Sequence, residues 1–151
     1  MANLELDYDM FGNRLSSIGG VPVGYHGVGN RPTQLAGWSL AYDMLGSRLS
    51  AIGPYSFTYD QLGNRVRTVG AWDLEYDRLG SRLRRIGPYE LTYDRLGNRV
   101  RTIGPLEVAY DLLGNRPATV SVDAPELSPE LLLALFVVLY LEERRREKDR
   151  P

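Results

Sequence analysis

The sequence predicts a mainly β protein: an antiparallel meander of about seven 17-residue β-hairpin repeats, forming a curved sheet or a barrel, followed by one C-terminal α-helix. Three observations support this fold class. Apolar and polar residues alternate within each repeat, and an unbroken apolar run, 131–141, follows the point where the repeats stop. The third observation is a regular spacing of seven tyrosines, namely Tyr8, Tyr25, Tyr42, Tyr59, Tyr76, Tyr93 and Tyr110.

The first half of each repeat has the pattern of a half-buried strand. In residues 88–104, Tyr89, Leu91 and Tyr93 alternate with polar neighbours, which is the period of two that a strand requires. The same alternation recurs in the other repeats. Each repeat therefore begins with a strand of about five residues.

The middle of each repeat predicts a tight hairpin loop and a second strand. Asp-x-Leu-Gly-Asn or Asp-x-Leu-Gly-Ser follows the tyrosine, where aspartate caps a turn and glycine adopts positive φ without a steric clash. A short strand then leads to Gly-Pro or a similar pair, which turns the chain back, as at Gly53-Pro54. Seven such units predict about fourteen antiparallel strands.

An aspartate and an arginine flank the loop of every unit except the second and are expected to pair across it. The arginine follows the aspartate by five residues, so both lie at the ends of the hairpin strands. We interpret them as structural turn pairs, with a repeated anion or calcium ladder as the alternative. The clearest pairs are Asp43 with Arg48, Asp60 with Arg65, Asp77 with Arg82, and Asp94 with Arg99.

A longer period of 34 residues overlies the shorter one. Residues 42–75 match 76–109 more closely than neighbouring units match each other. We interpret this as a recent duplication; the alternative is that odd and even hairpins occupy different environments, as in a flattened barrel. The aromatic residue that begins the first strand alternates between tryptophan and tyrosine with this longer period. These residues are candidate contacts for a ligand, and packing in the core is the competing interpretation. They are Trp38, Tyr55, Trp72 and Tyr89.

The repeated Tyr-Asp-x-x-Gly-Asn-Arg motif resembles the YD repeat of Rhs proteins, Tc-toxin C components and teneurins. The resemblance covers residues 4–120 in seven copies. It implies a spiral β-sheet, and it favours a bacterial origin and a short orphan array. The chain departs from these families because it lacks their many repeats, an Asp-Pro-x-Gly cleavage signature and a toxin domain. The resemblance therefore supplies an architecture rather than an activity.

The second repeat, which contains Tyr25 and which we call unit 2, departs from the pattern. His26 replaces the aspartate, and residues 19–29 are rich in glycine. We interpret His26 as structural and expect a bend, a distorted hairpin or a contact site there. Pro32 and Pro117 remove a donor from the sheet, so we expect their strands to be edges.

The sequence after the repeats predicts a linker and a helix. We divide the chain into a repeat array, 1–121, a linker, 122–128, and an apolar helix with a charged tail, 129–148. Ser128 is a suitable N-cap, Pro129 suits the first helical position, and Glu130 lies near the positive end of the helix dipole.

The apolar run of this helix must be covered on every side. Its eleven residues rise only about 16 Å, against about 30 Å for a bilayer core, so a full transmembrane span is not expected. We favour self-association or docking to a partner; insertion into the barrel lumen and contact with a membrane surface are the alternatives. The partner-binding candidates are Leu131, Leu132, Leu133, Leu135, Phe136, Val137, Val138, Leu139, Tyr140 and Leu141.

Composition gives little indication of catalysis or nucleic-acid binding. The net charge of −1 provides no overall field to attract nucleic acid or anionic lipid, and the absence of cysteine excludes disulfides and thiolate sites but leaves the compartment open. The N-terminus has no signal-peptide pattern, so we expect a cytoplasmic protein, with membrane association as an option. We expect no catalytic residues, metal, cofactor or nucleic acid, because the polar residues are repeated rather than unique. The local excess of arginine in 78–101 leaves an anionic partner as a weaker possibility.

The function expected from the sequence is a non-catalytic structural scaffold. Its repeat array would present an interaction surface, and its apolar helix would mediate homo-oligomerisation or docking into a larger complex. One alternative is a module that binds a carbohydrate or an apolar ligand, with the helix plugging its own barrel. A membrane-surface subunit is the other alternative.

Overall fold

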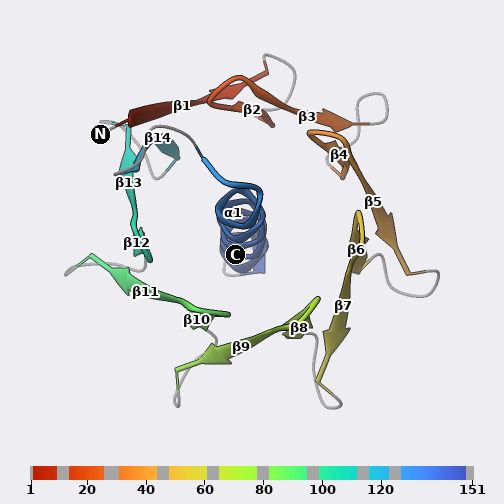
Figure 1. Ribbon diagram of the computed structural model, residues 1–151. Coiled ribbons are helices and arrows are strands. Elements are labelled where there is room, and N and C mark those ends of the chain that lie inside the picture. Colours follow the sequence, from red (N-terminus) through yellow and green to blue (C-terminus); the bar gives the residue numbers. More distant parts are fainter. Residues whose placement is uncertain are drawn as a thin grey trace.

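The computed structural model is a ring of fourteen antiparallel strands around one helix (Figure 1). It describes residues 2–9, 14–25, 31–43, 48–60, 65–77, 82–94, 99–111, 116–122 and 127–148. Each strand pairs with its neighbours in the chain, and the first strand pairs with the last, so the sheet is a closed barrel. The predicted fold class, a hairpin-repeat meander with one C-terminal helix, is confirmed.

The strands alternate between a first strand of five to seven residues and a second strand of four to six. Their bounds are β1 Ala2–Tyr8, β2 Leu15–Ile18, β3 Val21–Tyr25, β4 Pro32–Leu35, β5 Trp38–Tyr42, β6 Leu49–Ile52, β7 Tyr55–Tyr59, β8 Val66–Val69, β9 Trp72–Tyr76, β10 Leu83–Ile86, β11 Tyr89–Tyr93, β12 Val100–Ile103, β13 Leu106–Tyr110 and β14 Pro117–Val122.

The alternation of the sequence sets which side chains face the lumen. In β5 the central Leu40 is buried, while its neighbours Ser39 and Ala41 are exposed on the outer face. Leu40 lies opposite Ile52 of β6. Equivalent cross-strand pairs recur around the barrel and form one continuous apolar layer: Leu6 with Ile18, Val23 with Leu35, Phe57 with Val69, Leu74 with Ile86, Leu91 with Ile103, and Val108 with Val120.

The short turns between units require a positive φ at their first residue. Gly53 has φ 55° and Gly87 has φ 56°, the sign that the first position of a type II′ turn needs. Gly87 is also pressed against Trp72, since a Cβ there would lie 2.5 Å from the ring Cγ. Ala36 occupies the equivalent turn position, also with φ 55°. The residue that corresponds to Trp72 in this unit is Val21, which is smaller than the aromatic residues of the later units.

The two ends of the array meet at β1 and β14. Asn3 lies opposite Ser121, and the Ser121 hydroxyl donates to Asn3 Oδ1 at 2.8 Å. The expectation that the strands of Pro32 and Pro117 are edges is wrong, because β4 and β14 pair on both sides. Both prolines are tolerated because each is the first residue of its strand, next to an irregularity in the register.

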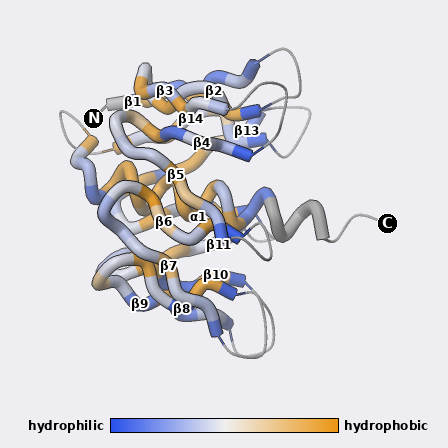
Figure 2. The backbone as a smooth tube through the Cα atoms, turned by 90° about the vertical axis from the view of Figure 1, so that its right-hand side faces the viewer, coloured by the Kyte–Doolittle hydropathy of each residue, from blue (hydrophilic) through white to orange (hydrophobic). Residues whose placement is uncertain are grey.

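The helix α1, Pro129–Lys148, runs along the barrel axis (Figures 1 and 2). Ser128 caps it, since its Oγ accepts from the Leu131 amide at 3.2 Å and its carbonyl accepts from the Leu132 amide at 2.9 Å. β14 ends at Val122, one residue inside the expected linker. The helix therefore starts where the sequence predicts, and it packs within the repeat array rather than apart from it.

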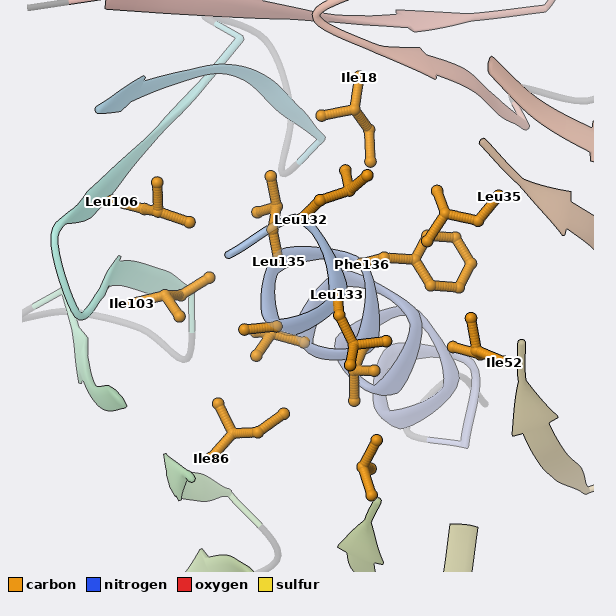
Figure 3. Packing of buried hydrophobic residues seen from close by; sticks show 14 of the residues in the cluster. Ile18, Leu35, Ile52, Ile86, Ile103, Leu106, Leu132, Leu133, Leu135 and Phe136 are labelled. Carbon is orange, nitrogen blue, oxygen red and sulfur yellow. The ribbon is translucent and has the colours of Figure 1, made fainter. Parts of the chain in front are cut away.

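Side chains from all sides of α1 meet the lumen-facing residues of the barrel. Figure 3 shows Leu132, Leu133, Leu135 and Phe136 pointing in different directions towards residues of the wall such as Ile18, Ile52 and Ile103. Residues 132–138 are all buried, and Ala134, Leu135, Val137 and Val138 are 0% exposed. The barrel and α1 thus share a single apolar core.

We predict that Gly87→Ala destabilises the barrel by about 2–4 kcal/mol. An alanine with positive φ costs about 1–2 kcal/mol, and its Cβ would also displace the Trp72 ring. Urea unfolding followed by circular dichroism measures the change.

Gly20→Ala is the matched control, because Gly20 has φ 86° but no heavy atom lies within 4 Å of the place that a Cβ would take. It should cost only the conformational term of about 1–2 kcal/mol. Equal losses in the two variants would contradict the packing of Trp72 on Gly87.

Candidate functional site: a tyrosine–arginine collar and an aromatic rim

The strands on the side where α1 leaves the barrel end in a ring of tyrosines and arginines, which we call the collar. Each arginine lies over the tyrosine ring of the following unit, with its Cζ between 4.2 and 4.7 Å from the ring centroid. Figure 2 shows hydrophilic strand ends at the end from which the C-terminus emerges. The pairs are Arg14–Tyr25, Arg31–Tyr42, Arg48–Tyr59, Arg65–Tyr76, Arg82–Tyr93, Arg99–Tyr110 and Arg116–Tyr8.

The last of these pairs closes the collar across the seam between β14 and β1. Arg116 lies 4.2 Å from the ring centroid of Tyr8, and the Tyr8 hydroxyl donates to the Pro117 carbonyl at 2.7 Å. Within the array the same bond recurs, for example from Tyr59 to the Leu49 carbonyl at 2.6 Å. The seam thus repeats the contacts that join neighbouring units.

Most collar arginines are also held by the aspartate at the other end of their hairpin loop. The Arg–Asp distances are 2.7 Å for Arg48 and Asp43, 3.1 Å for Arg65 and Asp60, 2.7 Å for Arg82 and Asp77, and 2.6 Å for Arg99 and Asp94. The aspartate amide donates to the arginine carbonyl as well, for example from Asp43 to Arg48 at 2.8 Å. The predicted turn pairs are therefore brought together, although the loop residues between them lie outside the described part of the chain.

Unit 2 is the exception, because His26 stands where the other units have aspartate. His26, for which we expect a structural role, lies outside the described residues. Arg31 is exposed, packs on Tyr42 at 4.5 Å and forms no ion pair with any residue the structure describes. Within the described ranges, no three acidic or histidine side chains gather as a metal site would require.

Burial changes the titration of two collar tyrosines. Desolvation raises the pKa of Tyr25 to about 12, opposed by nearby Arg14 and reinforced by Asp9 and Glu143. Desolvation also raises the pKa of Tyr76, against the opposing charge of Arg65. The influence of Glu143 on Tyr25 indicates that the end of the apolar run of α1 lies level with the collar.

Four of the five arginines that the structure describes in residues 78–101 form ion pairs. Arg84 binds Glu75 at 2.9 Å, and Arg85 binds Glu90 at 3.1 Å, while Arg82 and Arg99 belong to the collar. Arg78 and Arg95 lie outside the described residues. Of the described arginines in this stretch, only Arg101 makes no ion pair with another described residue, which gives an anionic partner little support.

The partner-binding candidates of the helix lie inside the barrel. Leu132, Leu133, Leu135, Phe136, Val137 and Val138 are buried, while Leu131, Leu139, Tyr140 and Leu141 are partly buried and pack against the same core. Phe136 and Tyr140 stack with ring centroids 6.2 Å apart. In this structure, therefore, the apolar run is covered by the chain's own strands.

The candidate ligand aromatics form a partly buried rim at the opposite end of the barrel from the collar. Trp38 and Tyr55 meet edge to face at 5.4 Å, and Trp72 and Tyr89 do so at 5.8 Å. The 34-residue period thus gives two equivalent aromatic pairs. Trp72 additionally lines an open hollow of about 350 Å³, together with Ala71, Asp73, Glu75, Arg85, Gly87 and Pro88.

The cation–π contacts of the collar are the main feature that we did not predict from the sequence. We paired each arginine only with the aspartate of its own loop. The signal that would have found these contacts is the constant spacing of eleven residues from each arginine to the next tyrosine, as from Arg14 to Tyr25.

The chain matches no family model, no curated protein and no solved structure. Over the part of the chain that the structure describes, no helix has the length and apolar character needed to cross a membrane.

We predict that the stability of the protein falls as the pH rises from about 10 to about 12. The pKa of Tyr25 is raised from its ordinary value of 10.0 to about 12 in the folded protein. The protonated hydroxyl therefore contributes fully to the free energy of unfolding below pH 10, the pKa in the unfolded chain, and this contribution is lost as the pH rises through the pKa of the folded protein. Urea unfolding at a series of pH values measures this slope.

Tyr25→Phe should reduce the slope in this pH window, because phenylalanine does not ionise. Tyr55→Phe is the control, since Tyr55 lies on the rim away from the collar. A slope unchanged by Tyr25→Phe would contradict the role of its buried hydroxyl.

Proposed function

We propose that the protein is a non-catalytic structural scaffold: a closed repeat barrel that presents its outer face for interaction and is supported internally by α1. The observation that carries the proposal is the burial of residues 132–138 within the lumen, on every side of the helix. Each large side chain buried in this way contributes about 1.5–3 kcal/mol to folding. A barrel held by such a core can act as a rigid platform.

The engagement of the polar residues supports a structural rather than a catalytic role. The collar arginines are shared between tyrosine rings and aspartates in a repeated arrangement, so none stands out as a unique reacting group. The proposed kinship with YD-repeat arrays rests on the seven copies of the motif alone.

Self-association or docking through α1 is the competing role, and it stays a prediction. It requires the buried residues to leave the lumen, because a helix covered by its own strands offers little apolar surface to a partner. The burial therefore favours the internal-support role. Contact with a membrane surface would require the same release of the helix.

We predict that Leu135→Ala lowers the free energy of unfolding by about 2–5 kcal/mol and leaves the mass in solution unchanged. Leu135 is 0% exposed, so its truncation leaves a cavity in the shared core. Light scattering gives the mass, for which we expect the 17.0 kDa monomer, and urea unfolding gives the stability.

Glu143→Gln is the control on the same helix, because Glu143 is exposed, and it should leave the mass unchanged with little effect on stability. If α1 joins subunits instead, the full chain will be an oligomer and Leu135→Ala will dissociate it. That result would refute the internal-support role and favour docking.

A further inference from the structure

The seam between β1 and β14 differs in kind from every other junction of the barrel wall. Of the fourteen junctions in the ring, thirteen join strands that are consecutive in the chain, so a turn or a loop limits how far those strands can separate. The strands of the seam are held together by non-covalent contacts alone. The helix α1 begins at Pro129, seven positions after β14 ends at Val122. One side of the seam is therefore the strand to which the enclosed helix is attached.

The seam can separate without breaking either of the hairpins beside it. Within β1, Ala2–Glu5 pair with β14, whereas Leu6–Tyr8 pair with β2. On the other side, β14 keeps five register pairs with β13. Opening the seam removes four register pairs between β1 and β14, the hydrogen bond from Ser121 to Asn3 and the collar contacts of Tyr8 across the seam. Both hairpins remain intact in the open state.

The rest of the wall can bend to widen such an opening. Each junction between consecutive units holds two register pairs. The junction inside each hairpin holds three register pairs, or five in β13–β14. A helix with its side chains is about 10–12 Å across, roughly twice the spacing of neighbouring strands. Small rotations at several of the weaker junctions can together supply a displacement of this size at the seam.

The two routes along the barrel axis are both costly for α1. Withdrawal past the rim would carry the charged residues 142–148 through an apolar lumen, where charged groups are strongly disfavoured. Withdrawal past the collar would draw the chain that joins Val122 to Pro129 into the same lumen, where its backbone groups would lack hydrogen-bond partners. A lateral route through the seam avoids both costs, because β14 and α1 move away from β1 together.

We propose that the seam between β1 and β14 is the gate through which α1 enters and leaves the lumen. In the closed state the wall covers the apolar run of α1, and in the open state β14 and α1 swing outward on β13 and expose it. The gate is independent of the scaffold role, since it holds whether or not the outer face binds a partner. Any role of α1 outside the barrel would begin with the opening of the seam.

Hydrogen exchange of the full, unsubstituted chain in a low concentration of urea, followed by mass spectrometry, detects the opening. A helix released from the lumen is only marginally stable in water, so its amides exchange in the open state. The central hairpin β7–β8 stays folded in that state and exchanges only on global unfolding. The amides of residues 131–141 are therefore expected to exchange about tenfold or more faster than the slowest amides of β7–β8.

A disulfide across the seam tests the route. Asn3→Cys with Ser121→Cys joins two register partners, whose Cα separation suits a disulfide, in a chain without other cysteines. Oxidation should slow the exchange of residues 131–141 to the rate of β7–β8, whereas the reduced variant should behave like the unsubstituted chain. Ala51→Cys with Ser56→Cys is the matched control, because these register partners lie on strands that a turn already joins. Its oxidation should leave the difference between α1 and β7–β8 in place.

Equal exchange of residues 131–141 and β7–β8 in the unsubstituted chain overturns the proposal, because α1 is then released only by global unfolding. Faster exchange of α1 that persists in the oxidised seam variant also overturns it, because the helix then leaves along the axis. Slowing confined to the seam variant, with circular dichroism showing both variants folded, supports the gate. Glu5→Cys with Thr119→Cys, a second register pair of the seam, takes the place of the first pair where that disulfide does not form.

Discussion

The structure depends on filling the lumen of a fourteen-stranded barrel with apolar side chains. A ring of this size is too wide for its own inward-facing residues to meet across the axis. The helix α1 supplies the missing layer, and its apolar residues point in all directions because the wall surrounds it completely. The absence of a polar stripe from residue 131 to residue 141, which is unusual for a helix on a protein surface, is what a central position requires.

The collar and the seam follow from the same geometry. Seven nearly equivalent hairpins share the wall, so each arginine finds the tyrosine of the next unit at a similar distance. When the seventh unit reaches the first, Arg116 and Tyr8 make this contact without a covalent turn between their strands. Closure therefore satisfies the strand edges, the cation–π contacts and the tyrosine hydrogen bonds together.

The sequence predicts the units of the fold better than their arrangement. The alternation around Leu91 and the glycine turns predict the hairpins, because these are local effects of side-chain period and backbone freedom. The edge expectation for Pro117 failed because ring closure pairs β14 with β1, and closure depends on the curvature accumulated over all the units, which a single unit does not encode. The edge expectation for Pro32 failed because a proline at the first position of a strand, beside a register irregularity, is tolerated between two neighbouring strands. The position of the Leu131–Leu141 run could not be deduced for a similar reason: its uniform apolar surface fits a lumen, a helix bundle or a membrane surface equally well. For the collar, the sequence predicted the arginine–aspartate pairs, whereas the stacking of each arginine on the tyrosine of the next unit depends on how neighbouring hairpins pack.

The pairing of β1 with β14 has a consequence for how the chain folds during synthesis. Strand β1, Ala2–Tyr8, is synthesised before the other strands of the barrel, its partner β14, Pro117–Val122, is synthesised after them, and α1 follows β14. Contacts so distant in sequence form slowly. The barrel therefore cannot close, and its lumen cannot be filled, until β14 and α1 have been synthesised.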